Sequence, residues 1–222
     1  MNKQRINNLT RTLMVILSYF IYTKILFTFF EVFNFGNPYD NWIFSFVSDL
    51  IYFVCIFYLY RRTFATDIKD LKKDFWKKFL IGIKWLVIAL IAQMVVAIII
   101  LPFFPSVTDN DAAIMDLPVV YMIFKTMIFS IIVEEIVFKK SIRDVIPNKV
   151  MFIVVSSLFY GIMNVIYTDF SSSLKLLNIL PYIVSSAIMG ILYVKTNNIS
   201  LVMLVKFTYN LLPLTAALLG WL

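Results

Sequence analysis

Two adjacent glutamates, Glu134 and Glu135, lie within an apolar stretch and are the strongest candidates for chemistry in the sequence. A charge inside the hydrocarbon of a membrane costs on the order of 2.5–3.5 kcal/mol on insertion scales, so each such charge needs a partner. Lys206 is expected at a similar depth in the last apolar stretch, and Asn210 follows it by one helical turn on the same face. Two carboxylates beside a lysine and an amide form either a catalytic site or an electrostatic clasp between helices.

Residue types that the chain lacks exclude several other chemistries. The 222 residues contain no histidine, which excludes Ser–His and Cys–His nucleophilic pairs and histidine-based zinc sites. The single cysteine, Cys55, cannot form an intramolecular disulfide or a thiolate metal cluster. The sequence also has no glycine-rich phosphate loop. We therefore expect no metal and no other cofactor.

Three further charges, Lys24, Asp49 and Lys125, lie within other apolar stretches. Antiparallel packing of the first two stretches would bring Lys24 and Asp49 to a similar depth, and Lys125 is a rival partner for the same aspartate. The favoured interpretation is an ion pair that fixes helix packing. A transport path lined by these three charges is the alternative.

The elements that hold all these residues are long apolar runs. Hydrophobic residues make up 61% of the chain and charged residues 15%, with a mean hydropathy of +0.88. In a soluble domain, apolar residues make up about 45–50% and charged residues about 25% of the chain. Each run approaches the roughly 20 residues that cross about 30 Å of hydrocarbon, so the sequence predicts an all-α polytopic transmembrane bundle with about seven spans. The predicted spans are residues 12–33, 42–60, 79–101, 118–138, 150–167, 179–195 and 199–220.

Basic residues gather on one side of these predicted spans. If the spans alternate in direction, fifteen of the twenty Lys and Arg residues fall on the amino-terminal side, and the opposite connections carry only Lys175. Because positive residues near membrane ends stay in the cytoplasm, we expect a multi-pass cell-membrane protein with a cytoplasmic amino terminus. The composition favours a bacterial plasma membrane.

The same charge distribution indicates the partners of the basic surface. A positive cytoplasmic face suits the lipid bilayer and its anionic headgroups, and nucleic acid is not expected. The basic loop at 61–78 interleaves Phe64, Leu71, Phe75 and Trp76 with its charges. An amphipathic helix on the membrane and a solvated charged loop are both open interpretations of this segment.

Three motifs in a fixed order carry a resemblance to a known family. The first is the run 133–140, which is similar to Glu-Glu-x-x-Phe-Arg-Gly and places Lys139 at the arginine position. The second is the run 156–164, similar to an aromatic residue followed four positions later by histidine, with Tyr160 and Asn164 in those places. The third, His-x-x-x-Asn, is matched by the run 206–210.

These motifs resemble the CPBP family of CAAX proteases and bacteriocin-processing enzymes, also called Abi proteins. The resemblance covers roughly residues 118–215, and it includes the run 190–198, which is similar to the family's glycine, tyrosine and threonine-glycine-asparagine pattern. It implies two parts: amino-terminal transmembrane helices over 1–117 and a CPBP/Abi-like core over 118–222.

The resemblance also implies roles for individual residues. In active members the first glutamate activates a water that attacks the scissile carbonyl, while the histidines and the asparagine orient that water or stabilise the oxyanion. Some accounts instead place a metal among these residues. Carried over, the roles are base for Glu134, supporting carboxylate for Glu135, structural partner for Lys139, degenerate histidine positions for Asn164 and Lys206, and oxyanion amide for Asn210.

Both histidine positions are substituted, which changes what the site can do. A lysine ammonium neither accepts a hydrogen bond nor binds a metal, and it favours the ionised carboxylate, which weakens Glu134 as a base. The preferred hypothesis is a catalytically degenerate pseudoprotease that acts as a regulator, an immunity protein or a scaffold for a partner membrane or cell-wall protein. The alternative is an active intramembrane endopeptidase that uses Glu134.

Overall fold

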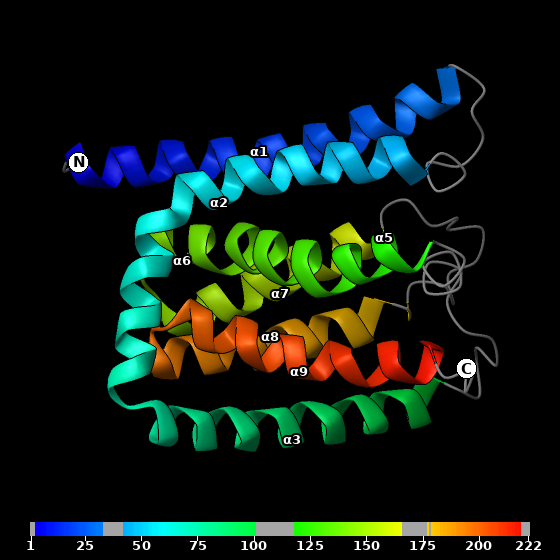
Figure 1. Ribbon diagram of the computed structural model, residues 1–222. Coiled ribbons are helices and arrows are strands. Elements are labelled where there is room, and N and C mark those ends of the chain that lie inside the picture. The colour runs from blue at the N-terminus through cyan, green and yellow to red at the C-terminus, as the bar shows by residue number, and fades with distance from the viewer. Residues whose placement is uncertain (1–2, 33–41, 101–117, 166–176, 178, 219–222) are drawn as a thin grey trace.

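A computed structural model of the chain describes residues 3–32, 42–100, 118–165, 177 and 179–218. Several side chains within the first helix, Lys24 among them, lie outside this description. All the elements in the described ranges are helices, which confirms the all-α fold class (Figure 1). The elements are α1 (Lys3–Val32), α2 (Trp42–Lys73), α3 (Phe75–Ile100), α5 (Val119–Ile123), η1 (Phe124–Glu134), η2 (Ile136–Ser141), α6 (Ile142–Val145), α7 (Lys149–Val165), α8 (Ile179–Thr196) and α9 (Ile199–Leu218).

The predicted spans coincide with these helices, with corrections at their ends. The first starts earlier, at Lys3, and the predicted fourth span, 118–138, continues without a break to Val145 through α5, η1, η2 and α6. Ile146 then adopts an extended conformation, with φ −101° and ψ 97°. A residue before proline is disfavoured in the helical region, and Pro147 follows, which explains the end of this helix.

The basic segment 61–78 is not a loop. Residues 61–73 continue α2 as helix, and α3 begins at Phe75. At about 1.5 Å per residue the 32 residues of α2 extend roughly 48 Å, well beyond the roughly 30 Å of hydrocarbon. Figure 1 shows the second half of α2 turning across the ends of the other helices, toward the start of α3. We call residues 61–73 the α2 extension.

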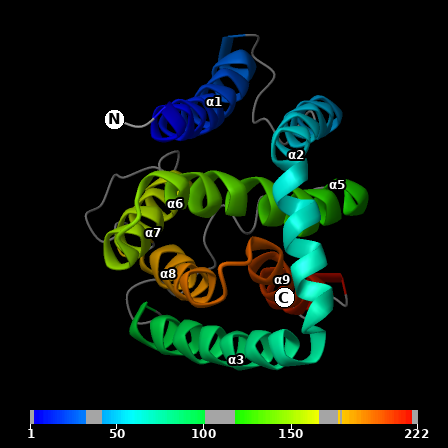
Figure 2. The same ribbon diagram turned by 90° about the vertical axis from the view of Figure 1, so that its left-hand side faces the viewer.

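The bundle is arranged in successive layers (Figures 1 and 2). Helices α1 and α2 lie on one side, the continuous α5–α6 rod and α7 lie in the middle, and α8 and α9 lie next to α3 on the other side. The tightest pairing joins α7 to α8, and α3 packs against both α8 and α9. Elements of the 118–222 region therefore form the centre of the bundle, and α1–α3 flank it.

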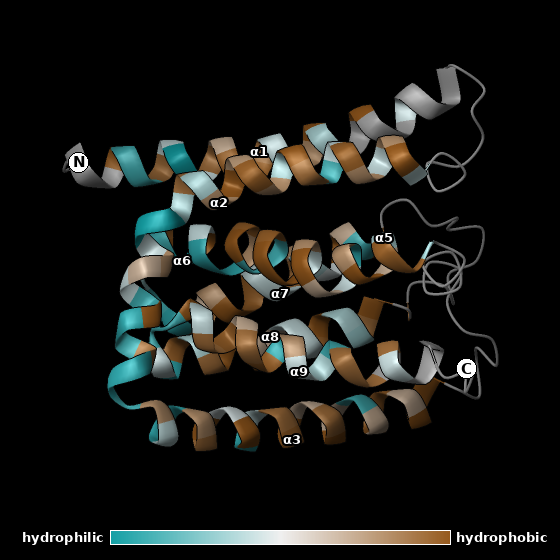
Figure 3. Cartoon of the chain, viewed as in Figure 1, coloured by the Kyte–Doolittle hydropathy of each residue, from teal (hydrophilic) through white to brown (hydrophobic). Residues whose placement is uncertain are grey.

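Apolar side chains cover the outside of this bundle. On α3, large residues such as Trp76, Leu80 and Ile98 are exposed, whereas Asp49 and Glu135 are buried inside. By length and composition, α2, α3 and α8 are each able to cross a membrane. Hydrophilic residues concentrate at the end of the bundle that holds the amino terminus, along the start of α1 and the α2 extension (Figure 3). This distribution is typical of a helical membrane protein.

Candidate functional site

Four charged side chains from two parts of the chain meet between the central rod and α9. Lys206 Nζ, on α9, lies 3.1 Å from Glu134 Oε2 and 3.1 Å from Glu135 Oε1. Lys139 Nζ lies 3.0 Å from Glu135 Oε2 and donates a hydrogen bond to Oε1 of the same carboxylate at 3.2 Å. We call these four residues the Glu–Lys cluster. Its two carboxylates and two ammonium groups give a formal charge of zero.

The helix geometry explains how two consecutive glutamates reach one lysine. Glu134 ends η1 and Glu135 precedes η2, and both segments are π-helical. In an α-helix, consecutive side chains diverge by about 100°. A π-helical turn holds more residues, so neighbouring side chains diverge less, and such turns are frequent at functional sites. Lys139 follows Glu135 by four positions and reaches back to it along the same segment.

The two glutamates differ in exposure. The side chain of Glu135 is 1% exposed and that of Glu134 is 14% exposed. Glu134 Oε2 also lies 3.3 Å from the hydroxyl of Ser130, which donates to it from one turn earlier. Of the two carboxylates, Glu134 is therefore the less enclosed by the protein.

Three residues outside the predicted set complete the surroundings of the cluster. Lys206 Nζ lies 3.5 Å from Tyr160 Oη, and the ammonium groups of Lys206 and Lys139 lie 5.0 Å and 5.4 Å from the centre of the Tyr160 ring. Ser186 Oγ lies 3.4 Å from Lys139 Nζ. Ser130 could have been found from its i, i+4 spacing to Glu134, and Tyr160 from its motif position. Ser186 carried no comparable signal in the sequence.

The two asparagines of the predicted site use their amides on backbone carbonyls. Asn164 Nδ2 donates to the carbonyl of Tyr160, one turn earlier in α7, at 2.8 Å. Asn210 Nδ2 donates to the carbonyl of Thr126 at 3.0 Å and so joins α9 to η1. Through Tyr160, whose hydroxyl lies 3.5 Å from Lys206 Nζ, Asn164 is linked to the Glu–Lys cluster. Asn210 thus holds the helix that carries Lys206 against the helix that carries Glu134.

The second charged set gathers around Asp49, which is fully buried. Lys125 Nζ lies 2.7 Å from Asp49 Oδ2, so the rival partner forms the ion pair. Tyr121 donates to Asp49 at 2.9 Å, and Tyr22 also donates to it. The alternative pairing with Lys24 rests on a side chain outside the described residues. This cluster joins α1 and α2 to the central rod.

The contacts between the four side chains of the Glu–Lys cluster are ion pairs. Glu134 accepts a hydrogen bond from the Lys206 ammonium at 3.1 Å, and the sequence has no imidazole to exchange protons with it. Within the described ranges, no three or more Cys, Asp or Glu side chains gather in a way that could hold a metal ion. The cluster is arranged to hold η1, η2 and α9 together.

Comparison with known proteins agrees with the motif analysis. Residues 116–212 match the family model described as type II CAAX prenyl endopeptidase Rce1-like. The matched segment includes all six predicted site residues, and it confirms the resemblance to the CPBP family. No curated protein and no solved structure matches the chain.

Proposed function

Because residues 116–212 carry the Rce1-like fold signature of the CPBP family, we propose that this chain is a pseudoprotease of that family. In this proposal the Glu–Lys cluster stands where the catalytic site of an active relative would lie. The protein acts through the shape that the cluster maintains, as a regulator, an immunity protein or a scaffold. Its partner is a membrane or cell-wall protein.

One observation carries this proposal. Lys206 takes a histidine position of the family motif, and its ammonium contacts both Glu134 and Glu135 at 3.1 Å. A general base must accept a proton from water and then release it, which requires a basic group that is free to change charge. Lys206 places an ammonium, which cannot accept that proton, at a position where the family motif has an imidazole.

The cellular location forms part of the proposal. The basic end of the bundle, with the start of α1 and the α2 extension, suits the cytoplasmic side of a cell membrane. The N-terminal end of α1 and the last described turn of α9 lie at opposite ends of the bundle, which supports an odd number of crossings (Figure 1). We place the amino terminus in the cytoplasm and the basic surface against anionic lipid headgroups.

The decisive experiment compares the wild type with Glu134→Gln in native membranes by sequencing all new protein amino termini. The proposal predicts the same set of termini from both proteins at equal abundance. Asp49→Asn is the matched control, because it also converts a carboxylate in a buried ion pair to an amide but lies outside the Glu–Lys cluster. Termini lost in Glu134→Gln and retained in Asp49→Asn would refute the proposal.

The same comparison tests the alternative, an intramembrane endopeptidase that uses Glu134. The observation in its favour is the 14% exposure of the Glu134 side chain, because an accessible carboxylate could meet a water. In that mechanism Asn210 would have to leave the carbonyl of Thr126 to serve an oxyanion.

A further inference from the structure

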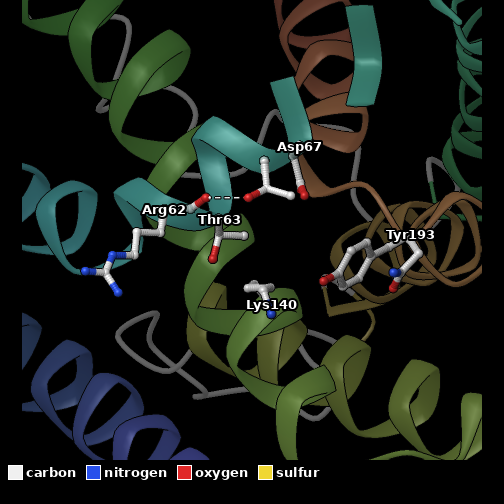
Figure 4. Close-up of a pocket in the computed structure, with 7 residues that line it drawn as sticks. Arg62, Thr63, Asp67, Lys140 and Tyr193 are labelled. Carbon is white, nitrogen blue, oxygen red and sulfur yellow. Dashed lines mark hydrogen bonds between the residues drawn. The ribbon is translucent and has the colours of Figure 1, made fainter. Parts of the chain in front are cut away.

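A pocket of about 320 Å³ lies at the amino-terminal end of the bundle, separate from the Glu–Lys cluster. This volume is near the lower end of the roughly 300–1,000 Å³ that is usual for small-molecule sites. The lining residues that matter for the argument are Arg62 and Thr63 of the α2 extension, Asp67 of the same segment, Lys140 of η2 and Tyr193 of α8 (Figure 4).

Tyr193 supplies a buried polar group that faces the pocket. The residue is 4% exposed, and its ring packs edge-on against Phe152 with ring centres 6.0 Å apart. Its hydroxyl has no hydrogen-bond partner among the residues that the structure describes. Figure 4 shows the hydroxyl end directed toward the side of the pocket where Lys140 lies. A hydroxyl at the wall of a pocket can both donate a hydrogen bond to a ligand and accept one from it.

The cations around the pocket exceed their local counter-charges. Lys140 Nζ pairs with Asp144, and the same carboxylate also accepts from Arg11 Nη2 at 2.7 Å. Two cations thus share one anion. Arg62 at the rim is exposed, and it forms no ion pair within the described part of the chain. The surplus of positive charge favours an anionic ligand.

Asp67 also lines the pocket, and its carboxylate could repel an anion. Hydrogen bonds from the start of α9 offset its negative charge. Asp67 Oδ2 accepts the backbone N–H of Ile199 at 2.8 Å, at the start of α9. The amino end of a helix carries a partial positive charge that offsets a carboxylate. Burial raises the pKa of the Asp67 carboxyl, and the amides of Ile199 and Ser200 counteract this effect.

The pocket also lies at the right depth for a lipid headgroup. The apolar part of α2, residues 42–60, extends about 28 Å, which nearly fills the roughly 30 Å hydrocarbon layer. Arg62 and Thr63 follow directly after it. They therefore lie where phosphate groups of the adjacent leaflet begin.

We propose that this pocket binds a phosphate-class anion through the hydroxyls of Tyr193 and Thr63 and the ammonium of Lys140, with Arg62 at the rim. A phospholipid headgroup and free phosphate share this chemistry. The depth of the pocket favours the headgroup of an anionic phospholipid. The site is independent of whether the Glu–Lys cluster is catalytic.

The test uses the purified full-length chain in neutral detergent. Thermal unfolding and native mass spectrometry are followed while phosphatidylglycerol, phosphatidylcholine or inorganic phosphate is added at matched ionic strength. We expect phosphatidylglycerol to bind and stabilise the wild type more than phosphatidylcholine does. Arg62→Gln should weaken its binding roughly tenfold, through loss of a charged hydrogen bond, and Tyr193→Phe should weaken it roughly threefold.

Two matched variants control for general effects. Arg61→Gln removes the same charge one residue away, where the guanidinium instead stacks 3.8 Å above the Tyr58 ring centre. Tyr60→Phe removes a buried hydroxyl that does not line the pocket. Both should bind phosphatidylglycerol within about twofold of the wild type.

The outcomes separate the two sources of phosphate. If inorganic phosphate stabilises the protein with the same sensitivity to Tyr193→Phe, and phosphatidylglycerol is no better than phosphatidylcholine, the site takes soluble phosphate and the anion assignment still holds. Equal losses in Arg61→Gln and Arg62→Gln would show diffuse attraction, and no binding of either probe would show an empty site. Either of those results would overturn the proposal.

Discussion

Lys206 Nζ lies 3.1 Å from Glu134 Oε2, although the two residues are 72 positions apart in the chain. The contact joins the final helix to the central rod inside the bundle. Removing one partner of a buried ion pair is destabilising because the other charge stays buried without a counter-charge. The contact is therefore expected to contribute to the stability of the bundle whether or not Glu134 takes part in chemistry.

We expect Glu134→Gln to lower the melting temperature of the protein in detergent. A fully buried pair costs about 3–5 kcal/mol when one partner is removed, and the loss should be smaller here because Glu135 still holds Lys206. Each kcal/mol corresponds to roughly 2–4 °C in a chain of this length. The double variant Glu134→Gln/Lys206→Met restores neutrality and should recover part of the loss. An unchanged melting temperature in Glu134→Gln would exclude the clasp.

Glu135→Gln should destabilise the protein more than Glu134→Gln. Glu135 is 1% exposed and contacts both Lys139 and Lys206, whereas Glu134 contacts only the second lysine. Its loss removes the ion pair of Lys139 and leaves Lys206 with Glu134 alone. Thermal unfolding of the two single variants in the same detergent gives the ranking, and the reverse order would contradict the geometry of the cluster.

Hydrolysis, if it can be restored, should require both histidines of the family motif. We expect Asn164→His/Lys206→His to create new protein amino termini in native membranes that neither single variant creates. A neutral imidazole can accept and donate a proton at once, which a lysine or an amide cannot. A general acid–base group contributes about 10²–10⁴-fold to a rate, so the gain should be measurable. Adding Glu134→Gln to the double variant should abolish it.

Two single variants can test which lysine, Lys125 or Lys24, neutralises Asp49. Lys125→Met should lower the melting temperature by on the order of 10 °C, since it removes the ammonium 2.7 Å from the fully buried carboxylate of Asp49. Lys24→Met is the matched control and should leave the melting temperature within the experimental error. Equal losses in the two variants would mean that both lysines neutralise Asp49.

Asn198 holds the α2 extension against the turn between α8 and α9. Its Nδ2 donates to the carbonyl of Asp67 at 2.9 Å and to Asp70 Oδ2 at 3.0 Å, and its Oδ1 accepts from the amide of Leu201. We expect Asn198→Ala to speed tryptic cleavage of the α2 extension in inside-out vesicles, at a cost of about 0.5–2 kcal/mol for the lost cap. Asn198→Ser, which keeps a capping oxygen, should be cleaved at an intermediate rate.

The spans were predictable because the mean hydropathy of some 20 consecutive residues depends only on their composition. It does not depend on which other helices pack against them. The meeting of Glu134 with Lys206 was predictable as well, since depth along antiparallel helices can be counted. The pair Glu135–Lys139 follows from its i, i+4 spacing. Each of these inferences uses only distance along a helix axis.

What the sequence could not supply is the rotation and order of the helices around one another. That information decides that Asp49 meets Lys125, and it brings Ser186 to Lys139. Asn198 lies in the motif run 190–198, and its contacts with the α2 extension depend on a bend in α2 that no proline or glycine marks. The π-helical form of η1 likewise has no recognised signature in its residues.

The spacing between Asp49 and Lys125 has a consequence for biosynthesis. The two residues are 76 positions apart, so a ribosome adding about 5–20 residues per second makes Asp49 about 4–15 s before its counter-ion. During that interval the newly inserted second helix carries Asp49 without Lys125. The ion pair that joins the second helix to the central rod therefore forms only after the fourth hydrophobic segment has been translated.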